Sequence, residues 1–419
     1  MTETTQTLPA TFGPFHLFDL IGRGGMAEVF LAKTFTGLGT DRLTVIKRIL
    51  PQFSSDATFC EMLIEEAKLC ARLSHANVVQ TSDLGCIDGR YYIAMEYVEG
   101  FDLNALLALC TRARIALPLQ FALYMIVETL KGLDYAHRLT EQSGAPLGII
   151  HRDVSPTNVL ISCDGGVKLC DFGIAKAALG DIGASRLDEY HLKGKVAYMS
   201  PEHLAGEPVD RRADLYAAGI LLWELLAGRR LFKSKDEEET LRKAKAAEIP
   251  ELPNRGYPEF ELLAAVVTRA LQKDPERRFK DGKEFIRALE DYMHAAGLLV
   301  SQLRFADFLM EHFGEDLLRQ RRARERSLAE MMDQEHGAPA SARDAAADKE
   351  CDAIRAAFDA PDDEEPACDE APPEPAVAPP EPVAAAKAPS PRGKALLWLA
   401  VAVALAGAGA VAAYLLATT

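Results

Sequence analysis

The sequence predicts an α+β fold of two unequal lobes, because its hydrophobic pattern changes once along the chain. From about residue 14 to residue 100, β-branched and aromatic residues alternate between glycine turns, as in FHLFDLIGRGG and RYYIAMEYV, which is typical of strands. One helical stretch, TFCEMLIEEAKLCARL, interrupts this part. From about residue 102 to residue 296, the apolar residues follow helical spacing. We therefore expect a small β-rich lobe with one helix, followed by a larger helical lobe.

Three further segments follow the two lobes. Residues 297–334 still show helical spacing but are heavily charged, so we expect a helical extension that packs partly on the larger lobe. Residues 335–394 are acidic and rich in Pro and Ala, with few large apolar residues, which predicts a disordered linker. Residues 395–417 carry no charge and as a helix would extend about 34 Å, enough to cross a bilayer. An Ala-rich buried helix is the alternative for this last segment.

The residues around the apolar segment predict how it would lie in a membrane. Arg392 and Lys394 precede it, so the positive-inside preference leaves residues 1–394 in the cytoplasm. MTETTQTLPATFGPF at the start lacks the basic and apolar regions of a secretory signal. We expect a tail-anchored, single-pass membrane protein. Gly409 and Ala413 have the spacing of a helix contact, which leaves a dimer open.

Composition narrows the classes of partner. The formal net charge of -15 argues against nucleic acid and favours a protein or small-molecule partner. The eight cysteines form no C-x-x-C pair, which fits reduced thiols in a cytosolic compartment better than disulfides or a zinc site.

Residues 21–30, IGRGGMAEVF, lie between two strand-like runs. Glycines at such a hairpin let backbone N–H groups approach a phosphate without a Cβ in the way. An ordinary tight hairpin is the alternative interpretation, since a lone G-x-G is a weak signal.

Lys47 lies in the strand-like run LTVIKRI, on one face with Val45. A lysine that binds phosphates must itself be held by a carboxylate, and Glu66 in the predicted helix is the candidate, with Glu65 as its competitor. A lysine that reaches solvent from an edge strand is the alternative.

Two tripeptides supply the oxygen ligands and the base that phosphoryl transfer needs. IIHRD places Asp153 after a strand-like run with Asn158 five residues later, and Asp171 opens the DFG of VKLCDFG. Asn158 and Asp171 suit Mg²⁺, a hard cation that takes one or two protein oxygens together with phosphate oxygens. Asp153 is then left to accept the proton of a substrate hydroxyl.

With these motifs in this order, residues 14–296 resemble the eukaryotic-like protein kinases, most closely the bacterial Ser/Thr kinases with an AYMSPE segment. The resemblance implies the bilobal kinase fold, ATP and Mg²⁺ as cofactors, and phosphorylation of Ser or Thr in protein substrates and in the chain itself. A membrane-tethered pseudokinase scaffold is the main alternative, and tyrosine specificity a lesser one.

The resemblance also assigns roles to individual residues. Met95 would guard the back of the adenine pocket, Glu202 would pair with Arg278, and Asp214 would brace the backbone of the catalytic loop. The residues assigned to ATP binding are those of the glycine loop, the strand lysine and the backbone beyond Met95: Ile21, Gly22, Arg23, Gly24, Gly25, Met26, Ala27, Glu28, Val29, Lys47, Glu96 and Val98.

Two departures from the family pattern lie close to the catalytic aspartate. Ser155 occupies the position where the family commonly has a lysine, and Lys195 occupies the position where bacterial relatives usually have a threonine. We interpret the two as an exchange that keeps a cation near the transferred phosphate, with independent loss in a weakened kinase as the alternative. Ser185 is the candidate phosphosite between DFG and SPE. For Cys170 we favour apolar packing over a thiol that faces the nucleotide.

Overall fold

The architecture comes from a computed structural model of the full chain. The chain divides into two units, residues 1–340 and 341–419, and the residues that the structure describes all fall in the first. They are residues 8–24, 27–34, 42–54, 68–141, 143–172, 196–234 and 236–336. Of the predicted linker 335–394, residues 335 and 336 are helical, and residues 337–394 lie outside the described residues, as does the predicted membrane span at 395–417.

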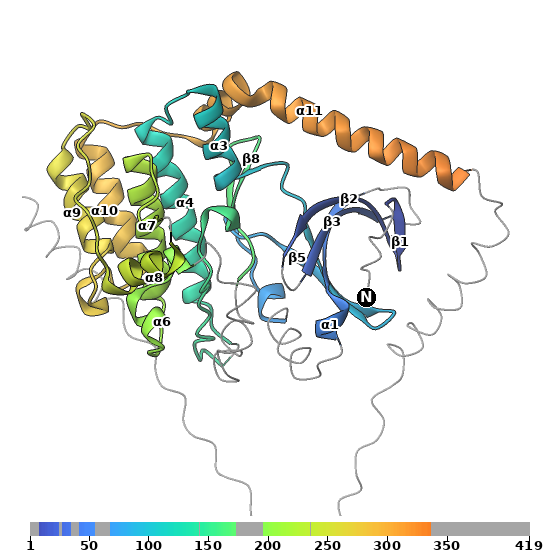
Figure 1. Ribbon diagram of the computed structural model, residues 1–419, viewed down its shortest axis with the longest axis horizontal. Helices are drawn as coiled ribbons and strands as arrows, with labels where there is room; N and C mark the ends of the chain where they lie inside the picture. The colour runs from blue at the N-terminus through green and yellow to red at the C-terminus, as the bar shows by residue number, and fades with distance from the viewer. Residues whose placement is uncertain are drawn as a thin grey trace, which may run out of the picture. The chain divides into compact units, whose positions relative to one another are not determined.

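A six-stranded antiparallel sheet forms the β lobe, in the order β1-β2-β3-β4-β6-β5 (Figure 1). Its strands are β1 (Ala10–Phe12), β2 (Phe15–Arg23), β3 (Ala27–Thr34), β4 (Arg42–Ile49), β5 (Thr81–Ile87) and β6 (Arg90–Glu96). A short helix, α1 (Pro51–Ser54), follows β4. Most of the helix predicted for TFCEMLIEEAKLCARL lies outside the described residues, and residues 68 to 71 near its end are helical.

The predicted glycine hairpin joins β2 to β3. Gly22 pairs with Val29 and Arg23 with Glu28, so the two strands close directly on the glycines. Inside the turn, the Gly24 N–H donates to the Ala27 carbonyl at 2.8 Å. The alternation of this region confirms the strand prediction, because inward residues such as Phe30 and Ile46 are almost fully buried.

The helical lobe is built around two buried helices, α4 (Leu119–His137) and α7 (Arg212–Ala227). Every residue of α7 after Arg212 is buried, as expected for a helix that is apolar on all sides. The other helices of this lobe are α3 (Leu103–Ala113), α6 (Pro201–Ala205), α8 (Glu237–Ala246), α9 (Phe260–Ala270) and α10 (Gly282–Ala295), with the 3₁₀ turns η3 (Val196–Tyr198) and η4 (Pro275–Arg277). This part of the structure agrees with the predicted larger helical lobe.

A small second sheet carries the catalytic motifs. Its strands are β7 (Gly100–Asp102), β8 (Val159–Ser162) and β9 (Val167–Leu169), in that order. The HRD loop and the 3₁₀ turn η1 (Pro156–Asn158) precede β8, and DFG follows β9. Because β8 and β9 are antiparallel neighbours, the start of one and the end of the other lie together. Two motifs that are distant in sequence are thus brought to one edge of this sheet.

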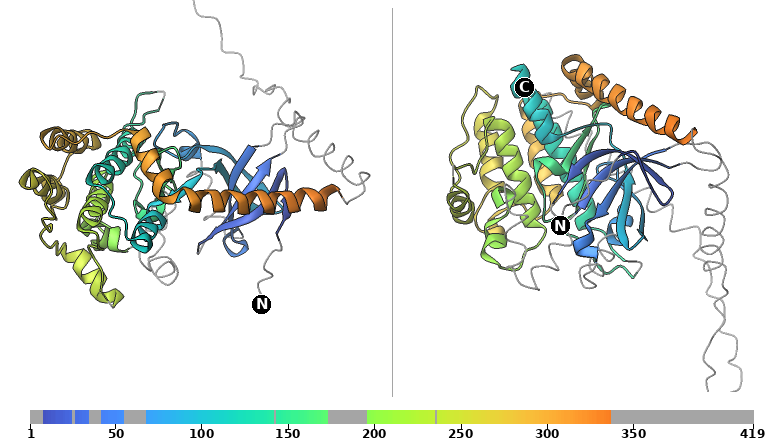
Figure 2. Two further views of the ribbon diagram at one scale, coloured as in Figure 1. Left: turned by 90° about the horizontal axis from the view of Figure 1, so that it is seen from above. Right: turned by 45° about the vertical axis from the view of Figure 1, so that its right-hand side comes forward.

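A long helix, α11 (Gln302–His336), follows the helical lobe and reaches back to strand β2 (Figures 1 and 2). Its first half buries Phe305, Leu309, Phe313 and Leu317, which recur at helical spacing. Among the helices that the structure describes, none combines the length and the low polarity that a bilayer crossing requires.

Candidate active site

A cavity of about 540 Å³ opens between the β lobe and the small sheet, within the size range of ordinary ligand sites. Strands β2, β3, β4 and β6 supply one side, and the segments around β7, η1 and DFG supply another. Lys47 and Asp171 both border it. The sequence motifs therefore converge on one space large enough for a nucleotide.

The glycine hairpin borders this cavity through Ile21, Gly22 and Val29. The neighbouring side chains of Arg23 and Glu28 instead pair with each other across the hairpin at 2.6 Å, and Glu28 also accepts from Arg48 at 2.9 Å. Gly24 forms the turn, and Ala27 is buried in a small cluster with Ile49 and Ile93. Gly25 and Met26 lie outside the described residues.

Met95, Glu96 and Val98 border the cavity from the strand that leads out of the β lobe. The Glu96 carboxylate accepts from the Gln80 N–H at 2.7 Å and from Lys168 Nζ at 2.8 Å. Because this side chain is engaged, a contact between Glu96 and a base falls to its backbone. The binding of adenine by the backbone of Glu96 and Val98 stays a prediction.

Lys47 lies on β4 beside Val45, as the alternation predicted, and both border the cavity. Its Nζ forms an ion pair with Asp171 Oδ1 at 2.8 Å. The predicted partner Glu66 lies outside the described residues, as does Glu65. The structure thus joins the lysine directly to the aspartate of DFG.

The catalytic loop is held by hydrogen bonds from Asn158. Its Nδ2 donates to the Asp153 carbonyl at 2.8 Å and to Asp153 Oδ2 at 3.1 Å. The Asn158 carbonyl accepts from the Cys170 N–H at 3.0 Å, which places it beside Asp171. Ser155 is buried, and its hydroxyl lies 3.1 Å from that of Thr157. Lys195 and Ser185 lie outside the described residues.

Asp214, near the start of α7, holds the backbone of this loop through hydrogen bonds. One carboxylate oxygen accepts from the Arg152 N–H, and the other from the His151 N–H, each at 2.8 Å. The second oxygen also accepts from His137 Nε2 at 2.7 Å. Burial alone raises the pKa of Asp214, but the bond from His137 and the nearby charges outweigh it and hold the pKa below its ordinary value. The predicted role of Asp214 is confirmed.

His151 links HRD to DFG. It is fully buried, its Nε2 donates to the Cys170 carbonyl at 3.1 Å, and its ring lies 4.4 Å from that of Phe172. Its Nδ1 accepts from the Asp153 N–H at 3.3 Å, so one neutral tautomer satisfies both bonds. Burial lowers the pKa of His151, which keeps it neutral near pH 7. The two motifs are therefore packed as one unit.

Glu202 and Arg278 form the predicted buried ion pair, with two parallel bonds of 2.7 Å. Arg278 also donates to the carbonyls of Gln272 and Lys273 and lies over the ring of Tyr216. Burial raises the pKa of Glu202, but the bonds from Arg278 outweigh it and lower the pKa overall. This pair holds the SPE motif at the start of α6 to the loop before α10.

Asn158 and Asp171 fit the demands of Mg²⁺. They supply an amide oxygen from the turn η1 before β8 and a carboxylate oxygen from the segment after β9, and Mg²⁺ takes only one or two protein oxygens at such sites. Within the described residues, no group of three or more His, Cys, Asp or Glu side chains could hold a metal. A metal held by this pair would complete its coordination with phosphate and water oxygens.

The cavity also contains residues that the sequence reasoning missed. Cys170 borders it and is half-buried, so the residue lies beside the nucleotide space, and the preference for apolar packing of its side chain stays a prediction. Asp102 and Thr157 border it next to motifs we had identified. Gln320, Ala323 and Arg324 come from α11, more than 140 residues after DFG, and no motif in the sequence indicated them.

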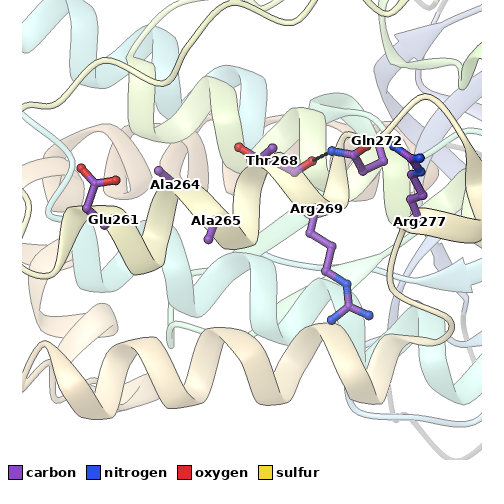
Figure 3. A pocket seen from close by; sticks show the side chains of 7 residues that line it. All are labelled: Glu261, Ala264, Ala265, Thr268, Arg269, Gln272 and Arg277. Carbon is purple, nitrogen blue, oxygen red and sulfur yellow. Dashed lines mark hydrogen bonds between the residues drawn. The ribbon is translucent and has the colours of Figure 1, made fainter.

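A separate hollow on the outer face of α9 takes no part in this site (Figure 3). Its polar side chains are engaged with each other or with neighbours: Gln272 donates to the Thr268 carbonyl, and Arg269 pairs with Glu284 on α10. None of the motif residues borders it.

The two lobes, the cavity and the paired HRD and DFG motifs define a protein kinase. The protein kinase domain family matches residues 15–289, and the chain belongs to that family.

Three known proteins show what the chain is similar to. The tyrosine-protein kinase MasK of Myxococcus xanthus is 37% identical over 343 residues, which cover 77% of this chain and 51% of MasK. A probable serine/threonine-protein kinase of Streptomyces coelicolor is 38% identical over 277 residues, 65% of this chain and 39% of that protein. The crystal structure of the Mycobacterium tuberculosis PknI kinase domain matches with a TM-score of 0.50 and 28% identity, over 68% of this chain and 98% of that domain. The chain thus spans about half the length, or less, of these two curated relatives.

Proposed function

We propose that the protein transfers the γ-phosphoryl group of ATP to serine or threonine hydroxyls of protein substrates and of itself. One observation carries this proposal: Lys47, Asp153, Asn158 and Asp171 form one connected set. Lys47 and Asp171 border the cavity as an ion pair, and Asn158 binds Asp153 through its side chain and DFG through its carbonyl. Loss of any one of them ordinarily cripples a kinase, so their joint presence argues against a pseudokinase scaffold. Similarity to serine/threonine-protein kinases also supports it.

Each residue of the set has a distinct role in the proposed reaction. Lys47 neutralises and positions the α- and β-phosphates, and Asp171 and Asn158 supply oxygens for Mg²⁺. Mg²⁺ bound there would neutralise charge on the phosphate oxygens. Asp153, fixed by Asn158, orients the substrate hydroxyl and accepts its proton.

Phosphoamino-acid analysis tests the residue specificity. We expect radiolabel from ATP on serine or threonine of the chain itself and of a generic protein substrate. The name of the similar MasK makes tyrosine the second candidate. Label confined to tyrosine would overturn the Ser/Thr proposal while leaving the kinase assignment intact.

The exchange of Ser155 and Lys195 remains our proposal for the cation missing from the HRD loop. Replacing Lys195 with alanine should lower the rate of phosphotransfer by about 10²-fold, the usual effect of losing one charge-stabilising group. The double change Ser155→Lys with Lys195→Thr should restore much of the rate, because it returns the cation to the loop. Steady-state kinetics of both variants decide the matter, and an unaltered rate in Lys195→Ala would show that no exchange occurred.

Arg152 supports the proposal of Ser185 as an autophosphorylation site, since a basic group beside the catalytic aspartate attracts an anion from the segment between DFG and SPE. Mass spectrometry of the ATP-treated protein should find phosphate on Ser185. If Ser185 carried no phosphate, it would not be the autophosphorylation site.

We also propose that residues 395–417 anchor the protein in a bacterial inner membrane with the kinase domain in the cytoplasm. The support is the uncharged apolar run itself and the two basic residues before it, Arg392 and Lys394. Cell fractionation should recover the full chain with the membrane and a variant without residues 395–417 in the soluble fraction. Equal distribution of the two would contradict the anchor.

A further inference from the structure

Helix α11 passes the opening of the nucleotide cavity and contacts both lobes. Its first half packs on the helical lobe, where Phe305 lies against Phe121 and Phe313 against Phe101. Further along, Leu328 packs against the cluster of Phe18, Leu31 and Val45 in the β lobe. The views in Figure 2 show the helix running over the strands of that lobe. One continuous element therefore connects the two sides of the cavity.

The inward-facing positions of α11 change from apolar residues to arginines where the helix crosses the segment between the lobes. Phe305, Leu309, Phe313 and Leu317 are buried, and the same spacing continues to Arg321, Arg324 and Leu328. The two arginines therefore occupy the face that points inward elsewhere along the helix. The Arg321 side chain is 52% exposed there, whereas that of Arg324 is largely buried and its charge requires a partner of opposite sign.

Glu99 is that partner. Arg321 binds it with two bonds, Nε to Oε1 at 2.9 Å and Nη2 to Oε2 at 2.6 Å, and Arg324 Nη2 donates to the same Oε1. The Arg324 guanidinium also lies 5.3 Å from the centre of the Tyr97 ring. Glu99 follows directly on Val98, which borders the cavity. We name these three residues, Glu99, Arg321 and Arg324, the α11 clamp.

The clamp differs from an ordinary surface ion pair. The Arg324 side chain is only 13% exposed and Glu99 is 29% exposed, so solvent screens them less than a fully exposed pair. The bond from Arg321 lowers the pKa of Glu99, with burial opposing it. The bidentate contact of Arg321 with the Glu99 carboxylate also fixes the relative orientation of the two side chains. The helix is thus held in one position at the cavity.

The residues of α11 beside the clamp border the cavity directly. Gln320, Ala323 and Arg324 line it together with Tyr97, Phe101 and Asp102. They leave the cavity about 540 Å³, so the helix bounds the space without filling it. A nucleotide held at the backbone of Glu96 and Val98 would have α11 along its solvent side.

We propose that α11 forms a wall of the nucleotide cavity, positioned by the clamp between Glu99 and the two arginines. This inference rests on the proposed function, because it takes an adenine nucleotide as the ligand. Gln320 and Arg324 supply hydrogen-bond donors there, and Ala323 supplies a small apolar surface. Releasing the wall exposes the bound nucleotide to solvent and weakens its binding.

The test is the dissociation constant of MgADP, measured by calorimetry on the full chain. The double variant Arg321→Ala/Arg324→Ala should bind about tenfold more weakly, the size expected when contacts on one side of a ligand site are lost. Glu99→Gln should weaken binding in the same direction. The matched control is Arg319→Ala, because Arg319 is 71% exposed on the same helix and pairs with Asp316, away from the cavity.

The possible outcomes distinguish failure of the proposal for α11 from failure of the proposed kinase function. Wild-type binding together with an unchanged or tighter constant in the double variant would overturn the wall and leave the kinase proposal standing. Absence of MgADP binding by the wild type would overturn both. Thermal unfolding of each variant checks that the helical lobe, which holds the first half of α11, stays folded.

Discussion

Replacing Asp153 with asparagine should lower kcat for phosphotransfer by about 10³-fold while the dissociation constant for MgADP stays the same. The amide cannot accept the proton of a substrate hydroxyl, so the chemical step loses its base. The fold should tolerate the change, because the new side chain has the same shape and the Asp153 carbonyl still accepts from Asn158 Nδ2. Steady-state kinetics and calorimetry measure the two quantities separately.

Asp291→Asn is the matched control for this change. Asp291 lies on the exposed side of α10 and undergoes the same chemical substitution far from the cavity. Its kcat should equal that of the wild type. If Asp153→Asn also kept the wild-type rate, the proton acceptor would have to be another group, and the assignment of the HRD loop as catalytic would fail.

Replacing Arg278 with alanine should reduce the free energy of unfolding by about 3 to 5 kcal/mol. The side chain of Arg278 is fully buried and that of Glu202 is 8% exposed, so the substitution leaves a carboxylate in the interior without its guanidinium. The carbonyls of Gln272 and Lys273 lose a donor as well. Urea denaturation followed by circular dichroism measures the loss.

Arg242→Ala provides the comparison, because Arg242 and Glu248 form an ion pair in which both side chains are about half exposed. Its cost should stay below about 1 kcal/mol. The pH dependence gives a second check. The pKa of Glu202 is lowered from 4.5 in the folded protein, so its contribution is present above that pH and is lost as the pH falls. Arg278→Ala should flatten this acid limb, and an equally steep limb would contradict the assignment.

The parts of the site that could be predicted from the sequence are those marked by short motifs next to a run of alternating or apolar residues. The glycine hairpin was readable because glycines follow an alternating run, and the structure closes β2 and β3 on them. HRD and DFG were readable because each follows a strand-like run in the sequence. In the structure β9 precedes DFG, whereas HRD follows a segment without regular structure, and antiparallel β8 and β9 then bring Asn158 to Cys170. The roles of Asp214 and Glu202 came only with the family resemblance.

The parts that sequence did not predict depend on contacts between distant segments. Residues 297–334 were expected to pack partly, yet their charged spacing gave no sign that Arg321 meets Glu99, which lies 222 residues earlier in the chain. Likewise the ion pair of Lys47 with Asp171, 124 residues later, was not predicted. The predicted pairing of Lys47 with Glu66 lies outside the described residues and stays a prediction. Neither observed ion pair produces a repeating pattern in the sequence, because each depends on how the two folded lobes pack together.

The ion pair between Lys47 and Asp171 makes the affinities for nucleotide and for divalent cation depend on each other. The two groups that would bind phosphate and Mg²⁺ neutralise each other at 2.8 Å. A nucleotide alone would draw Lys47 away and set its phosphates against the Asp171 carboxylate, while a cation alone would meet the Lys47 ammonium. When both ligands are present, Lys47 exchanges the Asp171 carboxylate for a phosphate, and Asp171 exchanges the Lys47 ammonium for Mg²⁺. Linkage then requires each ligand to raise the affinity for the other by the same factor, so ADP should bind more tightly with Mg²⁺ than without it.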